Sequence, residues 1–293
     1  MTLLIDILSL AATYAVMASG FVVVYRTSRV LNLAQPGFVL LAGYLAVDLL
    51  PDAAGRSANP WVLPFAVVSL LLGGAAVGGL VYWALIRPLA GQSRISLIMM
   101  TLAMLFLLQA LTQYIWSGAN SFIPLPGNQT ALELLGSRVR LFDLVAIGLG
   151  ALVLGLIGVL YSRSRFGIHM RAVAENPALA SRRGIDIDRV GAMSWALATS
   201  LAVVSALLTG MQSPVSPLLI GATLKGFSVA LVGGLDSLAG IAPAALLIAL
   251  MEVLVIQFVD QQLGQTVPFV VMLAVLMLRP WGLRGTVEEL DRV

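Results

Sequence analysis

The chain has 293 residues, of which 59% are hydrophobic and 11% are charged, and its mean hydropathy is +0.98. A soluble domain of this length does not need so much apolar surface, and continuous apolar runs of about 18 residues or more predict transmembrane helices. The runs do not alternate with polar residues, which excludes a membrane β-barrel. Cysteine is absent, which excludes disulfides, thiolate metal sites and a cysteine nucleophile. The net charge of +3 is spread over short loops, so it indicates membrane topology and no nucleic-acid partner.

Six long apolar segments come first along the chain, and each predicts a membrane span. They are residues 3–25, a second segment that ends near residue 50, and residues 61–86, 95–116, 141–161 and 190–211. The C-terminal third holds a short apolar piece at 218–232, a full-length span at 238–259 and a short final span at 266–278. We therefore expect one all-α domain over residues 1–293, a polytopic integral membrane protein with eight or nine helices. The number depends on whether 218–232 crosses the membrane or is re-entrant, and polar loops are expected at 117–140 and 260–265.

A polar break from Asn32 to Gly37 separates the first two spans. Pro36 and Gly37 at the mouth of a span predict a helix that starts late or is kinked. An interrupted membrane helix offers free backbone groups to a polar solute, and here it also offers the Gln35 side chain. The alternative is a plain kink at the membrane edge, and the residues themselves leave both open.

The longest polar run of the chain is 163–189, which holds six arginines, the only histidine and three acidic residues. Asn176 is a favoured N-cap, and Pro177 follows it at the first helical position. Gly184 suits the left-handed residue that ends a helix. The run therefore predicts a short capped helix of about two turns, which is too short to be stable without a neighbour.

The distribution of basic residues predicts the orientation, because cytoplasmic loops carry an excess of lysine and arginine. If the arginine-rich loop lies inside, 13 of the 17 basic residues lie inside. The other four are Arg56, Arg138, Arg140 and Lys225. We therefore expect the N-terminus outside and the C-terminus in the cytoplasm.

Five segments together resemble the permeases of branched-chain amino acid ABC importers, in particular the H-type subunit. They are residues 32–34, 171–185, 224–227, 232–240 and 278–283, and their order and spacing match the family along most of the chain. The resemblance implies the ABC importer permease fold with short or broken helices, in a bacterial inner membrane. It also implies four partners: a second permease subunit (the same chain or another), two ATP-binding subunits and an extracytoplasmic substrate-binding protein.

In such a family the arginine-rich loop, residues 162–189 here, couples the permease to its ATPase. The residues expected to carry this coupling are Arg171, Glu175, Asn176, Leu179, Ala180 and Gly184. A rigid short helix can transmit ATPase closure because a folded helix does not stretch. The alternative reading of the same residues is an ordinary inside loop anchored by arginines.

Two polar breaks are expected to line the translocation pathway, with Asn32, Gln35, Gly37, Gly233, Gly234 and Asp236. This chain departs from the family at both breaks. The family usually has His-Gly where Gln35 and Pro36 stand, and Gly where Asp236 stands. A simple cytoplasmic turn is the alternative for the second break, in which Asp236 or Ser237 caps the following helix.

Glu252 lies inside a full-length span, where a charged carboxylate costs about 2.5–3.5 kcal/mol on insertion scales. We expect it to be an intramembrane polar anchor between helices, since no second intramembrane acid or histidine is available for a proton relay. Lys225, the only lysine, is expected near the outer interface or bonded to backbone carbonyls.

The sequence favours a transport subunit without a cofactor or metal over an enzyme. His169 is the sole histidine and lies in the arginine-rich loop, and no phosphate-binding P-loop motif is present. ATP hydrolysis is therefore expected on a separate chain. The alternative function is a stand-alone secondary transporter or channel. The solute is left open among branched-chain amino acids, other amino acids, urea and short amides.

Overall fold

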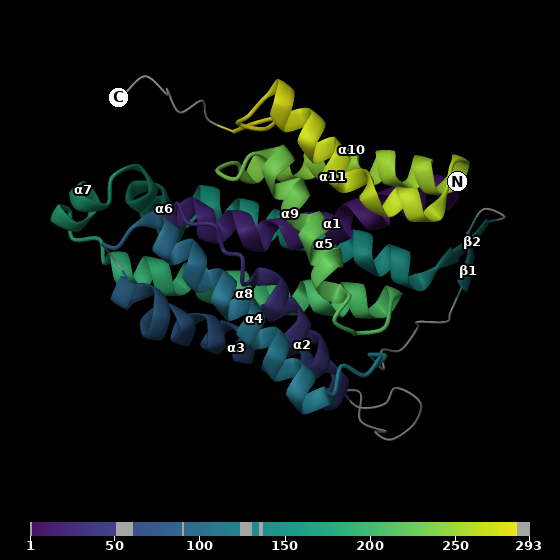
Figure 1. Cartoon of the computed structure of the whole chain (residues 1–293), viewed down its shortest axis with the longest axis horizontal. Helices are drawn as coiled ribbons and strands as arrows, with labels where there is room; N and C mark the ends of the chain where they lie inside the picture. The colour runs from purple at the N-terminus through teal and green to yellow at the C-terminus, as the bar shows by residue number, and fades with distance from the viewer. Residues whose placement is uncertain (1, 51–60, 90, 124–130, 135–136, 286–293) are drawn as a thin grey trace.

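The computed structural model describes residues 2–50, 61–89, 91–123, 131–134 and 137–285, and this part of the chain is mainly helical (Figure 1). Seven helical segments are long and apolar enough to cross a membrane. They are α1 (Thr2–Ser28), α3 (Val62–Val81, extended by short turns to Leu89), α4 (Arg94–Trp116), α5 (Leu141–Arg163), α8 (Ile187–Gln212), α10 (Leu238–Phe258) and α11 (Gln261–Leu278). Two shorter apolar helices are α2 (Gln35–Leu49) and α9 (Leu219–Gly233). The predicted polytopic all-α architecture is confirmed.

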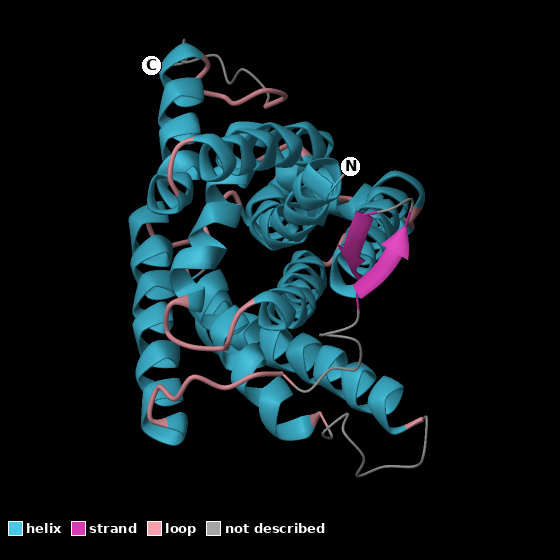
Figure 2. Ribbon diagram, turned by 90° about the vertical axis from the view of Figure 1, so that its right-hand side faces the viewer, coloured by secondary structure: helices cyan, strands magenta, loops and turns pink. Residues whose placement is uncertain are grey.

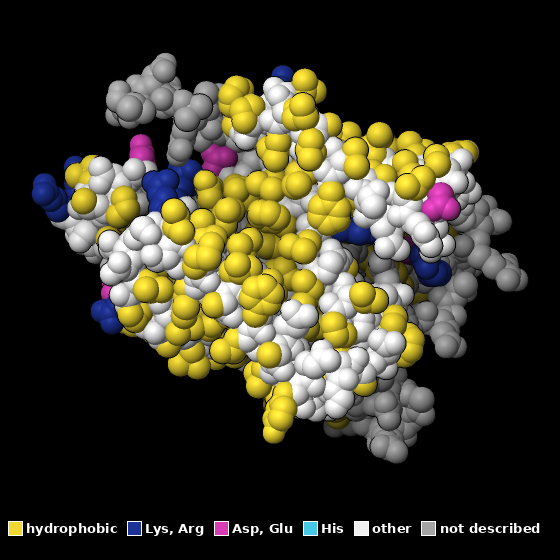
Figure 3. Space-filling model, viewed as in Figure 1, with side chains coloured by type: hydrophobic (Ala, Val, Ile, Leu, Met, Phe, Trp, Pro, Cys, Tyr) yellow, Lys and Arg dark blue, Asp and Glu magenta, His cyan; other side chains and the backbone are white. Residues whose placement is uncertain are grey.

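Helix α1 lies at the centre of the bundle and packs against α5, α8, α9 and α10. In its most apolar window 78% of the residues are buried, against 17% for α4 and for α11. The peripheral helices expose large apolar side chains instead, and Figure 3 shows hydrophobic side chains over much of the middle of one face, with basic and acidic side chains towards its two ends. This distribution is the one that a bilayer requires.

The two ends of the molecule differ. At one end lie α6 (Arg165–Glu175) and α7 (Pro177–Arg182), and at the other lie the N-terminus and a two-stranded antiparallel hairpin (Figure 1). The hairpin pairs β1 (Ala131–Leu134) with β2 (Ser137–Arg140) and is seen in front of the helices in Figure 2. A polar loop was expected over 117–140, and residues 131–134 and 137–140 of it form this hairpin. Arg56 lies outside the described residues, as do the side chains of β1 and of Arg138.

Small residues allow a close helix contact between α3 and α8. A side chain at Gly78 would meet the Trp195 carbonyl and the Thr199 hydroxyl, so only glycine fits there. The Thr199 hydroxyl also donates to the carbonyl of Gly74 at 2.7 Å, and Ser200 donates to another α3 carbonyl at 3.1 Å. Close approach combined with hydroxyl bonds across the contact is how helices associate in lipid. Helices α3 and α8 therefore form one rigid pair.

One predicted loop is wrong, and another holds more helix than expected. The 260–265 segment is helical, because the Asp260 carboxylate accepts the backbone amides of Gln262 and Leu263 at 2.7 and 3.2 Å and starts α11 immediately. The predicted 162–189 loop lies between α5, which ends at Arg163, and α8, which begins at Ile187, and most of it is helical. In both places local capping extends helices into polar sequence.

Candidate functional site

The predicted short capped helix is present as α7. The Asn176 side chain accepts the amide of Leu179 at 2.9 Å, and Pro177 occupies the first turn. At the other end Gly184 has φ +79, and the amide of Ile185 returns to the carbonyl of Ala180 at 3.1 Å. Both ends of α7 are therefore fixed by the residues that predicted them.

Helix α6, which sequence reasoning missed, gives α7 the support that a short helix needs. Met170 and Val173 of α6 are buried in a cluster that also contains Ala180 of α7 and Val190 of α8. Ser164 caps α6 by accepting the amide of Gly167 at 3.0 Å. The three-residue spacing of Gly167, Met170 and Val173 was the available signal, and the surrounding arginines obscured it.

Arg171 braces the loop against α5 instead of pointing away from the bundle. Its guanidinium donates to the Tyr161 carbonyl and lies 5.1 Å from the centre of the Tyr161 ring. Arg26, from the end of α1, lies over the same ring at 3.7 Å. Tyr161 therefore joins the ends of α1, α5 and α6 through two cation–π contacts.

Four of the six predicted coupling residues meet at a hollow of about 400 Å³ between α6 and α7. Its lining residues are Ala172, Glu175, Asn176, Leu179, Ala180, Arg183 and Ile185. Leu179 is 53% exposed, whereas Ala180 is only 4% exposed. Leu179 is thus available to another protein, and Ala180 packs within the loop.

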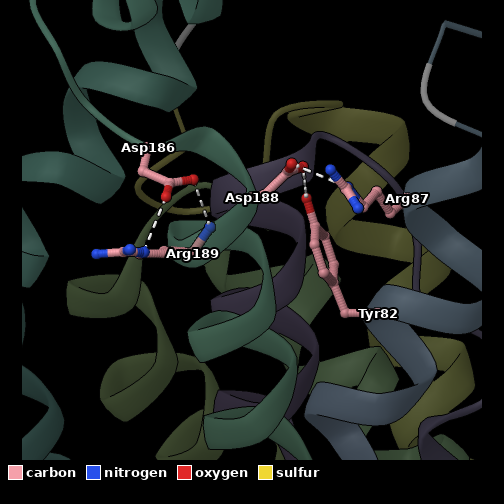
Figure 4. Close-up of polar contacts among 5 residues, drawn as sticks. All are labelled: Tyr82, Arg87, Asp186, Asp188 and Arg189. Carbon is pink, nitrogen blue, oxygen red and sulfur yellow. Dashed lines mark hydrogen bonds and ion pairs between the residues drawn. The ribbon is translucent and has the colours of Figure 1, made fainter.

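A polar cluster at the start of α8 lies directly after the loop (Figure 4). Asp186 caps α8 by accepting the amide of Arg189 at 3.1 Å, and its carboxylate pairs with the Arg189 guanidinium at 2.9 Å. Asp188 accepts the Tyr82 hydroxyl at 3.3 Å and pairs with Arg87 at 2.9 Å. Tyr82 begins a five-residue π-helical turn at the end of α3, Tyr82–Ile86, and such turns are frequent at functional sites. The sequence analysis did not identify this link between α3 and α8.

The first predicted part of the pathway is closed in this structure. Asn32 and Gln35 are both 1% exposed, and the Asn32 amide donates to Gln35 Oε1 at 3.2 Å. The Gln35 amide donates in turn to the Ala198 carbonyl on α8 at 3.0 Å. Gly37 packs closely against Leu108 of α4. The side-chain amides of Asn32 and Gln35 therefore bond to each other and to α8, which fixes the conformation of the break. Neither side chain is exposed to a cavity in this structure.

The second predicted part lies elsewhere, at the turn between α9 and α10. Gly234 has φ +98, and Ser237 caps α10 by accepting the amide of Gly240 at 3.2 Å. The C-terminal segment closes over this turn, since the amides of Leu283 and Arg284 donate to the carbonyls of residues 232 and 233 at 2.7 and 3.2 Å. The two predicted groups contact different elements and are not brought together.

Glu252 is 3% exposed and joins three helices. Its Oε2 accepts the Tyr14 hydroxyl of α1 at 2.6 Å, and its Oε1 lies 2.6 Å from the Lys225 ammonium of α9. The expectation for Lys225 was wrong in its partner: a carboxylate on α10, and not a backbone carbonyl, neutralises it. The pair lies 27 residues apart in sequence, so no local pattern could reveal it.

A bundle of membrane-length helices with a short broken segment and a folded polar loop at one end is the architecture of a polytopic membrane protein. The chain belongs to the family described as "Branched-chain amino acid transport system / permease component", which matches residues 3–276. The resemblance seen in the five sequence segments is thereby confirmed, and the chain is a permease component.

Relatives match over nearly the whole chain. The BraD permease protein of the high-affinity branched-chain amino acid transport system of Pseudomonas aeruginosa is 28% identical, over 97% of this chain and 95% of its own. A probable branched-chain amino acid transport permease protein, LivH, of Methanocaldococcus jannaschii is 27% identical, over 92% and 87%. The LivH permease protein of Escherichia coli is 24% identical, over 96% and 94%.

Proposed function

We propose that this permease component carries branched-chain amino acids inward as part of an ATP-driven importer. The observation that supports this proposal most is the full-length match to permease proteins named for that solute class. The importer would contain a second permease subunit, two ATP-binding subunits and an extracytoplasmic substrate-binding protein. This chain would supply the pathway and hydrolyse no ATP.

The α6–α7 loop is the surface proposed for ATPase docking. Leu179 is an exposed large apolar residue of a helix that is capped at both ends, and the hollow beside it has room for a partner side chain. The loop is bound to the bundle through the buried contacts of α6 and the Arg171 brace. A displacement of α7 would therefore be transmitted to α8 and, through the contacts of Asp188, to the end of α3.

The proposed orientation puts the α6–α7 end in the cytoplasm and the N-terminus outside. Six arginines belong to the 163–189 run, and Arg26 lies at the same end of the bundle. The hairpin end would then face the substrate-binding protein. The membrane is the bacterial inner membrane in this proposal.

Glu252 is proposed as a polar anchor between α1, α9 and α10. Two short charge-assisted hydrogen bonds, one from the Tyr14 hydroxyl and one from the Lys225 ammonium, hold its carboxylate in place. Each bond crosses from α10 to a different helix, so the anchor fixes the spacing of all three.

The test is leucine uptake into proteoliposomes that contain this chain with its ATP-binding subunits and second permease, supplied with the substrate-binding protein. Uptake should require ATP on the side of the membrane that α7 faces, and unlabelled isoleucine and valine should compete. Urea and acetamide serve as matched competitors of the other solute classes. Uptake that urea or acetamide blocks and isoleucine does not would refute the assignment, and uptake without the ATP-binding subunits would instead favour a stand-alone transporter.

A further inference from the structure

The Lys225–Glu252 pair lies inside the bundle, near the middle of the helices that it joins. Tyr14 stands at the middle of α1 and Lys225 at the middle of α9. Helix α9 has 15 residues, so it is about 22 Å long, shorter than the roughly 30 Å hydrocarbon layer. Short helices that end in breaks commonly border solute sites in transporters.

Glu252 and Lys225 differ in how much of their hydrogen-bonding capacity is used. Both oxygens of Glu252 are used, one by Tyr14 and one by Lys225. An ammonium has three N–H donors, and within the described part of the chain Lys225 makes one hydrogen bond, to Glu252. Two donors therefore remain, on a side chain that keeps 16% of its surface accessible while Glu252 keeps 3%.

The face of α9 that carries Lys225 is open next to these donors. Leu218, Gly221 and Lys225 follow one another at spacings of three and four residues, so they share one face of α9. Leu218 is 83% exposed, and a side chain at Gly221 would meet no atom within 4 Å. An open ammonium in a membrane span is costly against lipid, so this face must meet water or protein.

Charge balance indicates which solute fits. Lys225 and Glu252 together are neutral, so a lone carboxylate bound to Lys225 would leave a net negative charge in a region of low dielectric. An amino acid carries its own ammonium and keeps the total at zero. A neutral solute such as urea needs no charged donor.

We propose that Lys225 binds the carboxylate of a zwitterionic amino acid during transport, while Glu252, itself held by the Tyr14 hydroxyl, positions the Lys225 ammonium. Gly221 provides the space for this solute on the open face of α9. The inference rests on the proposed import function, which it extends by naming a binding group and the part of the solute that it recognises.

A single cysteine reports occupancy directly, because the natural chain has none. The Gly221→Cys variant is reconstituted in the complete importer, and its modification by a water-soluble maleimide is timed. Leucine should slow the modification several-fold, whereas leucinol, which lacks the carboxylate, and 4-methylpentanoate, which lacks the ammonium, should not. Protection should disappear when Lys225→Met is added. No modification at all, or equal protection by leucine and leucinol, would overturn the site.

A paired substitution separates binding from structural support. Lys225→Met with Glu252→Gln removes both charges and keeps a partner for Tyr14, and neutral replacements of buried ion pairs often leave stability unchanged. This double variant should assemble and lose leucine uptake by at least tenfold, while Lys225→Arg should retain part of it. Wild-type uptake by the double variant would make the pair purely structural.

The natural importer is measured in parallel, because it separates failure of the site from failure of the proposed function. If the natural importer takes up no leucine, the proposed function fails. If it takes up leucine but leucine does not protect the Gly221→Cys variant, only this site fails.

Discussion

The Asp188 carboxylate on α8 accepts the hydroxyl of Tyr82 on α3 at 3.3 Å, and this bond ties the end of one helix to the start of the other beside the arginine-rich loop. The Tyr82 ring also packs where a side chain on Gly191 would stand. Arg87 reaches the second oxygen of the same carboxylate at 2.9 Å. Any motion of α7 that shifts the start of α8 must therefore move the end of α3 as well.

Removing this link should uncouple transport from ATP hydrolysis before it affects folding. Tyr82→Phe keeps the ring beside Gly191 and loses one hydrogen bond, worth about 0.5–1.5 kcal/mol. We expect a small change in melting temperature and lower uptake for each ATP hydrolysed, measured on the reconstituted importer. Tyr82→Ala should lower the melting temperature further, because it also empties the space beside Gly191. An unchanged ratio of uptake to hydrolysis in both variants would show that the link does not transmit motion.

Two neighbouring glycines of α3 provide a matched test of the α3–α8 contact. Gly78→Val places methyl groups against the Trp195 carbonyl and the Thr199 hydroxyl and should destabilise the chain by about 1–3 kcal/mol or more. A Cβ at Gly79 would meet no atom within 4 Å, so Gly79→Val should be close to the natural protein. Thermal unfolding in detergent, followed by size-exclusion chromatography, compares them. Equal losses would mean that helix propensity, and not the contact, sets the cost.

Exposure separates two roles within α7. Leu179→Glu changes a side chain that is 53% exposed, so it should leave the melting temperature unchanged and prevent co-purification of the ATP-binding subunit. Ala180→Glu buries a charge in the cluster with Val173 and Met170. This variant should therefore unfold the loop, which lowers the melting temperature and prevents co-purification of the ATP-binding subunit. Co-purification of the ATP-binding subunit with Leu179→Glu at wild-type yield would remove α7 from the docking surface.

The ion pair in the membrane makes a further prediction about stability. Glu252→Leu leaves the Lys225 ammonium without its carboxylate partner and should destabilise the chain by about 3–5 kcal/mol. Lys225→Met with Glu252→Leu should recover most of that loss, since no buried charge is left alone. Chemical or thermal unfolding of the natural chain and the two variants, together with Lys225→Met alone, measures the coupling. Additive losses in the double variant would show that the two side chains act independently.

Topology can also be tested with single cysteines, because the natural chain contains no cysteine. The Arg182→Cys variant should resist a membrane-impermeant thiol reagent in intact cells and react after the cells are opened. Gln212→Cys changes an exposed residue at the other end of α8, and this variant should react in intact cells. The reverse pattern would invert the proposed orientation.

Sequence predicted the helices well wherever the cause is local. Apolar length defined the spans, and Asn176 with Gly184 defined α7 through capping bonds only a few residues long. The same reasoning missed the cap at Asp260, because the polar residues after it were taken as a loop.

Contacts between distant residues could not be predicted. Tyr14 and Glu252 are 238 residues apart, and Tyr82 and Asp188 are 106 apart. Such pairs depend on how the helices are arranged around α1. This arrangement cannot be inferred from any single segment of the sequence. For the same reason the polar residues near Asn32 and near Gly233 were grouped as one pathway, although each group contacts different elements.

The closure of residues 282–285 over the turn at 232–234 has a consequence for biosynthesis. The carbonyls of Val232 and Gly233 leave the ribosome before α10 and α11, and the amides that bind them leave after both helices. Until the α10–α11 hairpin has entered the bilayer, this turn has no such cover and depends on water or the insertion machinery for its hydrogen bonds. A chain cut short directly after α11 would therefore keep all its membrane helices while the carbonyls of this turn stay uncovered.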